Sequence, residues 1–515
     1  MKVYLRYFGL VMIAVIIPLI FVMFVEDSSY PEKREEVFTE RLVDTQTESK
    51  LLNTSETISV KDFGAVGDGV SDDYQALKSA FNYVNQKGGN VTLVFPKGTY
   101  FIERVYKAKN FGVKLTDSSE PWEGSKNEEI THLFIKDASN FNIIGNGSTI
   151  KVKGDYHKTI DADLWGEKYT FKYPVMPFVF LNCSNFTMSG FDINGSGDQT
   201  TRESNSIAEA YGYGLLLQDS SNFVIKDILT HNWVTDGLIV GHLGWVTNGE
   251  FINIVSEHNA RQAISIDLAK NLVFRNSRFS YAGQLEGGTY GSHSLGAGLN
   301  IEPEGGATLE NPTENIFFED SEFSHNIGAE IFATWEVAKE IYFKRCKVIR
   351  SVSKIGEGIL LGTNSTYFED TMFDFHKKVG VILTNFSDTY SSSKFIRSHF
   401  IDARIMSDLP EQPLVIEESI IEFLGKDQDD IPIIYIENNQ AILKNNRIFI
   451  GKDYYNCFNQ PCQRLYYGQG KFDSNVYETD KSGVGYFFSF YGKRAIIKNE
   501  VYPSSQFQKV KEQSN

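Results

Sequence analysis

The chain has few cysteines, which cross-link small secreted folds, and few prolines, which interrupt regular secondary structure. Its 515 residues include only 4 cysteines and 13 prolines, and four cysteines are too few for a disulfide scaffold. Aromatic residues and glycine are plentiful by contrast, with 39 Phe, 26 Tyr and 42 Gly. This balance favours β-structure with many turns.

Positive charge is scarce as well. The 66 acidic residues outnumber the 50 Lys and Arg residues, which gives a formal net charge of −16 at pH 7. Such an excess argues against nucleic acid as a partner. The sequence also has no phosphate-binding loop, zinc-ligand spacing, nucleophile elbow or dinucleotide fingerprint in a suitable context, which argues against those kinds of site.

Residues 7–25, "YFGLVMIAVIIPLIFVMFV", form an uncharged apolar run about long enough to cross a bilayer once. Basic residues precede the run and acidic residues follow it, so residues 1–6 should stay in the cytoplasm while the remainder is exported. A cleaved signal peptide is the alternative, but no small-x-small cleavage site follows. We expect an uncleaved transmembrane signal-anchor and a flexible polar stalk over residues 26–57.

The four cysteines fall into two groups. Cys457 and Cys462 in "CFNQPC" could close a small disulfide loop in an oxidising compartment or remain ordinary thiols. Cys183 and Cys346 lie within apolar strand patterns, so we expect them in the core.

The length of the chain exceeds the usual ceiling for one compact core, so the chain is either multidomain or a repeat fold. A unit of small residues, Asn and alternating apolar residues recurs as "ASNFNII", "CSNFTMS", "SSNFVIK", "AKNLVFR" and "TENIFFE", starting at Ala138, Cys183, Ser220, Ala269 and Thr313. Spacings of one to two coils of roughly 20 to 28 residues are typical of a parallel β-helix, in which each coil buries apolar side chains against its neighbours. We expect this all-β solenoid over residues 58–500, with a tail at 501–515.

Residues 58–102 open the domain with a helical pattern. Leu77, Ala80, Phe81 and Val84 share one face, Ser71 or Asp72 can cap the helix, and Gly88-Gly89 ends it. A helix over residues 73–85 could cover the exposed end of the solenoid.

The same segment carries a long ordered motif. Its "DFGA", "GDG", "DD", "GG" and "PKGTY" stretches begin at Asp62, Gly67, Asp72, Gly88 and Pro96. In this order they resemble the opening motif of the pectate lyase superfamily, specifically its rhamnogalacturonase/epimerase-like type. The resemblance implies a right-handed parallel β-helix. It implies no single activity, because the superfamily includes lyases, glycoside hydrolases, epimerases and phage tailspikes.

Aligning the strands as successive coils points to a candidate site. If the apolar pairs Leu238/Val240, Ile264/Ile266, Leu299/Ile301 and Ile331/Ala333 face inward, the residues that follow them form an outward column of Gly241, Asp267, Glu302 and Thr334. Ser265 and Asn300 form a second column. Because coils stack about 4.8 Å apart, the carboxylates of Asp267 and Glu302 should repel each other. One carboxyl should then have a raised pKa, or both should bind the same cation. An acid/base pair or a divalent metal site would use this arrangement.

Long insertions flank these strands, at residues 195–214, 283–298 and in "PEGGATLENPTE" after Ile301. Their Tyr, Ser, Asn and Gly residues suit a groove for sugar hydroxyls and ring faces. The alternative is a solvated surface on which Arg261 or Lys270 neutralises the acids.

Asp236 in "HNWVTDG" could be a third acid or a turn-capping residue before Gly237. The "TDG" is similar to the "NTDG" of polygalacturonase-type glycoside hydrolases. That family's paired Asp-Asp, Gly-His-Gly and Arg-Ile-Lys motifs are not in place here, so we do not expect a standard polygalacturonase.

Four further residues are candidates for substrate binding. His258 and Arg261 enter the Asp267 coil, and a uronate lyase or epimerase could use them to abstract the C5 proton and to neutralise the carboxylate. Glu330 and Glu304 are secondary candidates, and each would otherwise be an exposed polar residue.

The leading hypothesis is a membrane-anchored, extracytoplasmic polysaccharide hydrolase. Asp267 and Glu302 would act as its acid and its nucleophile or base, with Asp236 assisting and Asn300 and Ser265 binding substrate. Such a hydrolase needs no cofactor. The alternatives are a calcium-assisted polyuronate lyase or C5-epimerase, and a non-catalytic glycan-binding solenoid.

Overall fold

The structure is a computed structural model. It describes residues 52–109, 132–154, 157–160, 169–199, 212–286, 296–303, 306–350, 357–375, 380–384, 392–407, 414–424, 434–450, 462–479, 485–490 and 496–498. The expected signal-anchor, the tail at 501–515, Glu304 and Cys457 lie outside these residues. Within the described residues, no helix is both long and apolar enough to cross a membrane.

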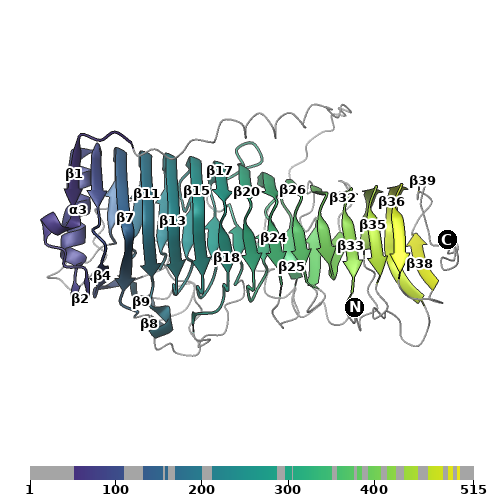
Figure 1. Cartoon of the computed structure of the whole chain (residues 1–515), viewed down its shortest axis with the longest axis horizontal. Coiled ribbons are helices and arrows are strands. Elements are labelled where there is room, and N and C mark those ends of the chain that lie inside the picture. Colours follow the sequence, from purple (N-terminus) through teal and green to yellow (C-terminus); the bar gives the residue numbers. More distant parts are fainter. Residues whose placement is uncertain are drawn as a thin grey trace. The chain divides into compact units, whose positions relative to one another are not determined.

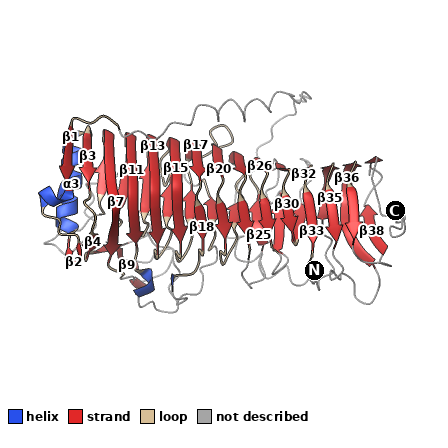
Figure 2. Cartoon of the chain, viewed as in Figure 1, coloured by secondary structure: helices blue, strands red, loops and turns tan. Residues whose placement is uncertain are grey.

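Three rows of parallel strands build the described part of the chain (Figures 1 and 2). The first row carries the candidate site and contains β6 (Phe134–Lys136), β10 (Phe178–Leu181), β12 (Leu215–Gln218), β14 (Leu238–Val240), β16 (Ile264–Ile266), β19 (Leu299–Ile301), β22 (Ile331–Ala333), β25 (Glu357–Leu361), β28 (Gly380–Thr384), β31 (Ala403–Ser407) and β38 (Gly485–Phe490).

The second row contains β1 (Glu56–Ser59), β3 (Val91–Val94), β7 (Ser139–Val152), β11 (Ser184–Asn194), β13 (Ser221–His231), β15 (Val246–Glu257), β17 (Ala269–Arg275), β20 (Thr313–Glu319), β23 (Ala338–Lys344), β26 (Ser365–Glu369), β29 (Ser392–Ile396), β32 (Leu414–Glu417), β34 (Ile434–Lys444), β36 (Cys462–Asp473) and β39 (Ile496–Lys498). Strands β34 and β36 also pair within the first row.

The third row contains β2 (Asp68–Asp72), β4 (Thr99–Ile102), β18 (Arg278–Ser280), β21 (Glu322–Ser324), β24 (Lys347–Ile349), β27 (Met372–Asp374), β30 (His399–Ile401), β33 (Ile420–Phe423), β35 (Arg447–Ile450) and β37 (Val476–Thr479). The second halves of the long strands β7 and β15 pair within it. A separate antiparallel sheet joins β5 (Val105–Lys109), β8 (His157–Ile160) and β9 (Tyr169–Pro174). Parallel pairing between successive coils is the pattern of a parallel β-helix, as the repeats predict.

Left-handed residues five positions apart turn the corners of the central coils. The residues with φ between 50° and 61° include Asn222, Asp227 and Asn232 on one coil, Asn248, Asn253 and His258 on the next, and then Asn271, Asn276, Tyr281, Asn315, Asp320 and His325. Asn tolerates this conformation better than most residues. The Asn of each repeated motif is therefore a corner residue.

The first corner is also a ladder of side-chain amides. The Nδ2 of Asn271 donates to the Oδ1 of Asn248 at 3.0 Å, and the Nδ2 of Asn315 donates to the Oδ1 of Asn271 at 3.0 Å. Each amide thus bonds to the coils on both sides of it. The ladder holds neighbouring coils in one register.

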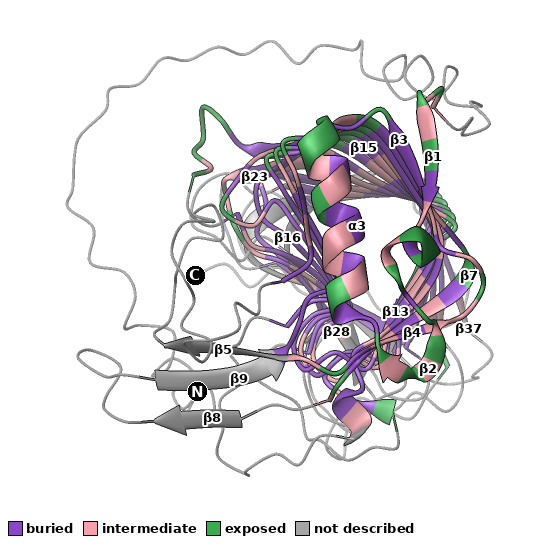
Figure 3. Ribbon diagram, turned by 90° about the vertical axis from the view of Figure 1, so that its left-hand side faces the viewer, coloured by how far each residue is buried: buried purple, intermediate pink, exposed green. Residues whose placement is uncertain are grey.

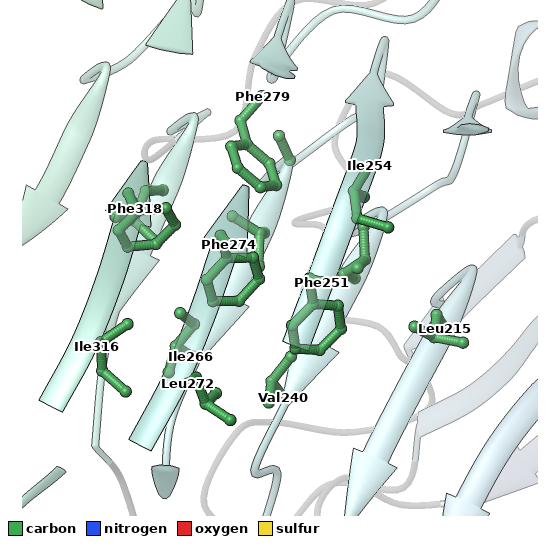
Figure 4. Packing of buried hydrophobic residues seen from close by; sticks show 14 of the residues in the cluster. Leu215, Val240, Phe251, Ile254, Ile266, Leu272, Phe274, Phe279, Ile316 and Phe318 are labelled. Atoms are coloured by element: carbon green, nitrogen blue, oxygen red, sulfur yellow. The ribbon is translucent and has the colours of Figure 1, made fainter. Parts of the chain in front are cut away.

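Stacked aromatic rings fill the interior. Phe251 and Phe274 have ring centroids 4.5 Å apart, and the stack continues through Phe318, 4.7 Å further on (Figure 4). Cys183 and Cys346 are buried, as predicted, and burial raises the pKa of each thiol to about 12. Such thiols are unreactive at neutral pH.

The helix at the N-terminal end of the domain is α3 (Tyr74–Lys87), and the short 3₁₀ helix η2 (Val60–Phe63) precedes it. The buried face of α3 contains the predicted Leu77, Ala80, Phe81 and Val84. Figure 3 shows α3 lying across the end of the coil. The N-cap residue is Asp73 rather than Ser71 or Asp72, and its side chain makes no capping hydrogen bond. Asp72 accepts a hydrogen bond from the Tyr74 amide, and the Ser71 hydroxyl donates to Asp68. Gly88 ends the helix at φ 65°.

Glu330 is fully buried, so the expectation that it is an exposed polar residue is wrong. It precedes β22 at the position that Gly298 occupies before β19, where the side chain points into the coil. Its Oε2 accepts from the Nδ2 of Asn326 at 2.5 Å, and its Oε1 lies 3.9 Å from the Nη1 of Arg350. Burial raises the pKa of Glu330 to about 8, although Arg350 and Asn326 oppose the shift.

The amide ladder predicts a specific loss of stability. Asn271→Ala should lower the free energy of unfolding by about 1–2 kcal/mol, because alanine tolerates φ > 0 poorly and cannot hydrogen-bond. Asn271→Gly keeps the conformation and removes only the amide. Urea unfolding should rank wild type, then Gly, then Ala, and an Ala variant as stable as wild type would contradict the role of this corner.

Glu330 predicts a pH dependence. A carboxyl whose pKa is raised on folding contributes stability below its unfolded value, near 4.5, and this contribution is lost as pH rises through about 8. Glu330→Gln mimics the protonated acid, so the variant should gain stability relative to wild type as pH increases from 5 to 9. Thermal unfolding of both proteins across this range measures the difference. If the stabilities of the variant and of wild type changed with pH in the same way, Glu330 would have an ordinary pKa.

Candidate active site

The register brings the two predicted acids onto adjacent coils. Ile266 pairs with Ile301, and the Glu302 amide donates to the carbonyl of Ile266 at 2.9 Å. Asp267 and Glu302 therefore follow neighbouring strands at equivalent positions, as the alignment predicts. Gly241 precedes them in the same column, where a Cβ would lie 2.3 Å from the Leu268 carbonyl oxygen.

Asp267 is buried rather than exposed, with 11% of its side chain accessible. Its Oδ2 lies 3.4 Å from the Nδ1 of His242. Desolvation raises the pKa of this carboxyl, and the hydrogen bond and charge of His242 only partly oppose the shift. A carboxyl of this kind is suited to holding a proton and donating it.

Glu302 is half-buried and is held by its own strand. The Nδ2 of Asn300 donates to the Oε2 of Glu302 at 2.8 Å, which orients the carboxylate. The Oδ1 of Asn300 is buried and has no hydrogen-bond partner within the described part of the chain. Such an acceptor can receive a hydroxyl from a bound molecule.

Asp236 and Arg261 form a bidentate ion pair beside the two acids. The Nε and Nη2 of Arg261 donate to the two carboxylate oxygens of Asp236 at 2.7 and 2.5 Å. The Ser265 hydroxyl and the Gln262 amide donate to the same carboxylate, at 3.0 Å each. Burial alone would lower the pKa of Arg261, but the charge of Asp236 outweighs it and the pKa is raised. Asp236 therefore anchors Arg261 and Ser265.

Two further side chains complete the cluster. Tyr213 is buried, its ring centroid lies 6.4 Å from that of His242, and it interacts electrostatically with Arg261. The sequence patterns singled out neither His242 nor Tyr213 as a site candidate. The available signal was position, because Tyr213 precedes β12 by the same two residues that separate Asp236 from β14.

The remaining candidates lie elsewhere. His258 stacks on Tyr281, with ring centroids 4.6 Å apart, at the corner before β16, whereas Asp267 follows the other end of that strand. Glu330 points into the core, as described above. Among the described residues, no three acidic, His or Cys side chains gather as they would around a metal ion.

The acids occupy a polar gap on the outer face of the first row of strands. The outward residues at the middle of successive strands are Val179, Leu216, Ile239, Ser265, Asn300, Phe332 and Leu360. The first three are buried in one apolar cluster, and Phe332 and Leu360 belong to another. Ser265 and Asn300 interrupt this apolar surface beside Asp267 and Glu302.

Curated relatives of the chain include enzymes and a binding protein. Mannuronan C5-epimerase AlgE1 of Azotobacter vinelandii is 26% identical over 289 residues, which cover 50% of this chain and 18% of the relative. Plasmin and fibronectin-binding protein A of Streptococcus pneumoniae is 36% identical over 85 residues, 16% of this chain and 11% of the relative. The chain thus spans less than a fifth of the length of either protein.

A solved structure similar to this chain is the A-module of the A. vinelandii mannuronan C-5 epimerase AlgE6. It is 14% identical with a TM-score of 0.42, over 87% of this chain and all of the module. Residues 57–290 match the family model described as rhamnogalacturonase A/epimerase, pectate lyase-like. Over these residues the chain is similar to the pectate lyase-like β-helix family, the family that its opening motif resembles.

Proposed function

We propose that the chain is a polysaccharide-active enzyme that hydrolyses glycosidic bonds with Asp267 and Glu302. The observation that carries the proposal is the placement of these two carboxyls on adjacent coils in a polar gap, one buried with a raised pKa and the other half-exposed. Two carboxyl groups in unlike environments can divide the acid and nucleophile roles.

In this mechanism Asp267 protonates the glycosidic oxygen as its bond to the anomeric carbon breaks. Glu302, oriented by Asn300, attacks that carbon from the other side. Water then releases the sugar while Asp267 takes back a proton. Coils about 4.8 Å apart favour this retaining course, since retaining enzymes hold their carboxyls about 5–5.5 Å apart.

Local charge favours a neutral glycan. Asp236 pairs with Arg261 and offsets much of its charge. Within the described part of the chain, Arg261 also interacts electrostatically with Asp267 and Glu302, and His242 lies beside Asp267. A substrate carboxylate would meet net negative charge here, which costs free energy unless a cation intervenes.

The second candidate is a polyuronate lyase or C5-epimerase. The similarity to mannuronan C5-epimerases favours it, as do Tyr213 and His242, whose side chains could move the C5 proton. Calcium usually takes six to eight oxygen ligands, and the described residues bring only two carboxylates together at the acid pair. The site therefore does not fit a calcium ion held by protein side chains alone, and no step is assigned to one.

Location is part of the proposal. We infer from the charge asymmetry around residues 7–25 that the domain works outside the cytoplasm, tethered to the membrane. Protease added to intact spheroplasts should then degrade the domain while a cytoplasmic marker survives. Protection of the whole chain would contradict the anchor.

Product analysis distinguishes the activities. The purified chain is incubated with neutral and uronic glycans, with and without EDTA. New reducing ends without ultraviolet absorbance indicate a hydrolase, an unsaturated uronide indicates a lyase, and uptake of solvent deuterium at C5 without cleavage indicates an epimerase. Binding without any of these products indicates a glycan-binding solenoid.

Substitution of the acids tests the assignment. Asp267→Asn and Glu302→Gln should each reduce turnover by roughly 100- to 10,000-fold while preserving the fold. Asp236→Asn is the structural control, since it leaves Arg261 uncompensated and should cost about 3 kcal/mol of stability. Full activity in both acid variants would show that the acids are not catalytic.

A further inference from the structure

The outer face of the first row of strands is more deeply buried on the N-terminal side of the acids than on the C-terminal side. Toward the N-terminus, the outward residues Leu216 and Ile239 are 0% and 3% exposed. Toward the C-terminus, Phe332 is partly buried, Leu360 on the next coil is 8% exposed, and Met406 further along is partly buried. A long ligand centred on the acids can therefore continue along this face in one direction, over the coils that follow Glu302.

Two aromatic side chains lie on the first coil in that direction. Phe332 pairs in register with Asn300, and Thr334 follows its strand at the position of Glu302 on the preceding coil. Trp335 comes next and is 39% exposed, an unusually high value for a tryptophan. Trp335 is therefore an exposed indole on the coil next to the one that carries Glu302.

We propose that Phe332 and Trp335 form a sugar subsite, occupied by the pyranose unit of the glycan next to the one at Asp267 and Glu302. This inference rests on the proposed function and adds the direction of the bound chain. The C–H face of a pyranose ring is apolar, and an aromatic side chain provides a large apolar surface at low entropic cost.

The spacing of the coils supports the match. Neighbouring coils lie about 4.8 Å apart, close to the length of one pyranose unit, so a glycan along the solenoid axis presents about one sugar per coil. The sugar beyond Glu302 then lies over Phe332 and Trp335, while the buried Oδ1 of Asn300 can accept a hydroxyl from the sugar at the acids.

Binding is measured in the Glu302→Gln background, in which substrate is not consumed. The probes are glucose-built and uronate-built oligosaccharides from disaccharide to octasaccharide, titrated by calorimetry against the full chain. Trp335→Ala removes the aromatic surface of the proposed subsite at this position, and Trp335→Phe retains an aromatic ring. Ile420→Ala is the matched control, because Ile420 is also 39% exposed but lies on β33 of the third row.

Trp335→Ala should weaken binding of the longer oligosaccharides roughly tenfold, the factor that corresponds to about 1.4 kcal/mol, and should flatten the rise of affinity with length. Trp335→Phe should recover most of the loss, and Ile420→Ala should change nothing. Equal affinities for Trp335→Ala and its parent at every length would overturn the subsite while leaving the proposed function intact. A glycan bound through Trp335 but never cleaved by wild type would support the subsite and overturn the enzyme. No binding of any oligosaccharide by the parent would overturn both.

Discussion

The structure depends on one recurrent constraint, the return of each coil into register with the coil before it. Backbone hydrogen bonds between parallel strands satisfy the polar groups only if the corners recur at a fixed spacing. Left-handed residues such as Asn248, Asn253 and His258 provide that spacing, and the amide ladder through Asn271 joins neighbouring corners directly. Interior phenylalanines then stack because the corners hold their strands one above another.

The candidate site follows from this register. Asp267 and Glu302 are separated by 35 positions in the sequence, yet they occupy equivalent positions because Ile266 pairs with Ile301. The same pairing sets Ser265 beside Asn300 and Phe332 beyond it. A solenoid can thus build a row of functional groups from single residues that recur along the chain.

Burial divides the acidic residues into different roles. Asp236 is fully buried and hydrogen-bonded on both oxygens, so it positions Arg261. Glu330 is also fully buried but points into the interior, where its pKa is raised to about 8. Of these four described acids, Asp267 and Glu302 are the two that follow strands at the outer face beside Ser265 and Asn300. The reactivity of a carboxyl here depends on its depth in the coil more than on its place in the sequence.

The sequence by itself determined the solenoid, the N-terminal helix and the alignment of Asp267 with Glu302, because each rests on a short-range pattern: repeated Asn, three-four apolar spacing, and alternation along a strand. Only the tertiary structure decided which polar side chains face one another across coils. It placed Tyr213 and His242 in the site, turned Glu330 inward and bound Asp236 to Arg261. These contacts depend on burial and on side-chain packing between coils, and neither quantity is encoded in the period of the repeat.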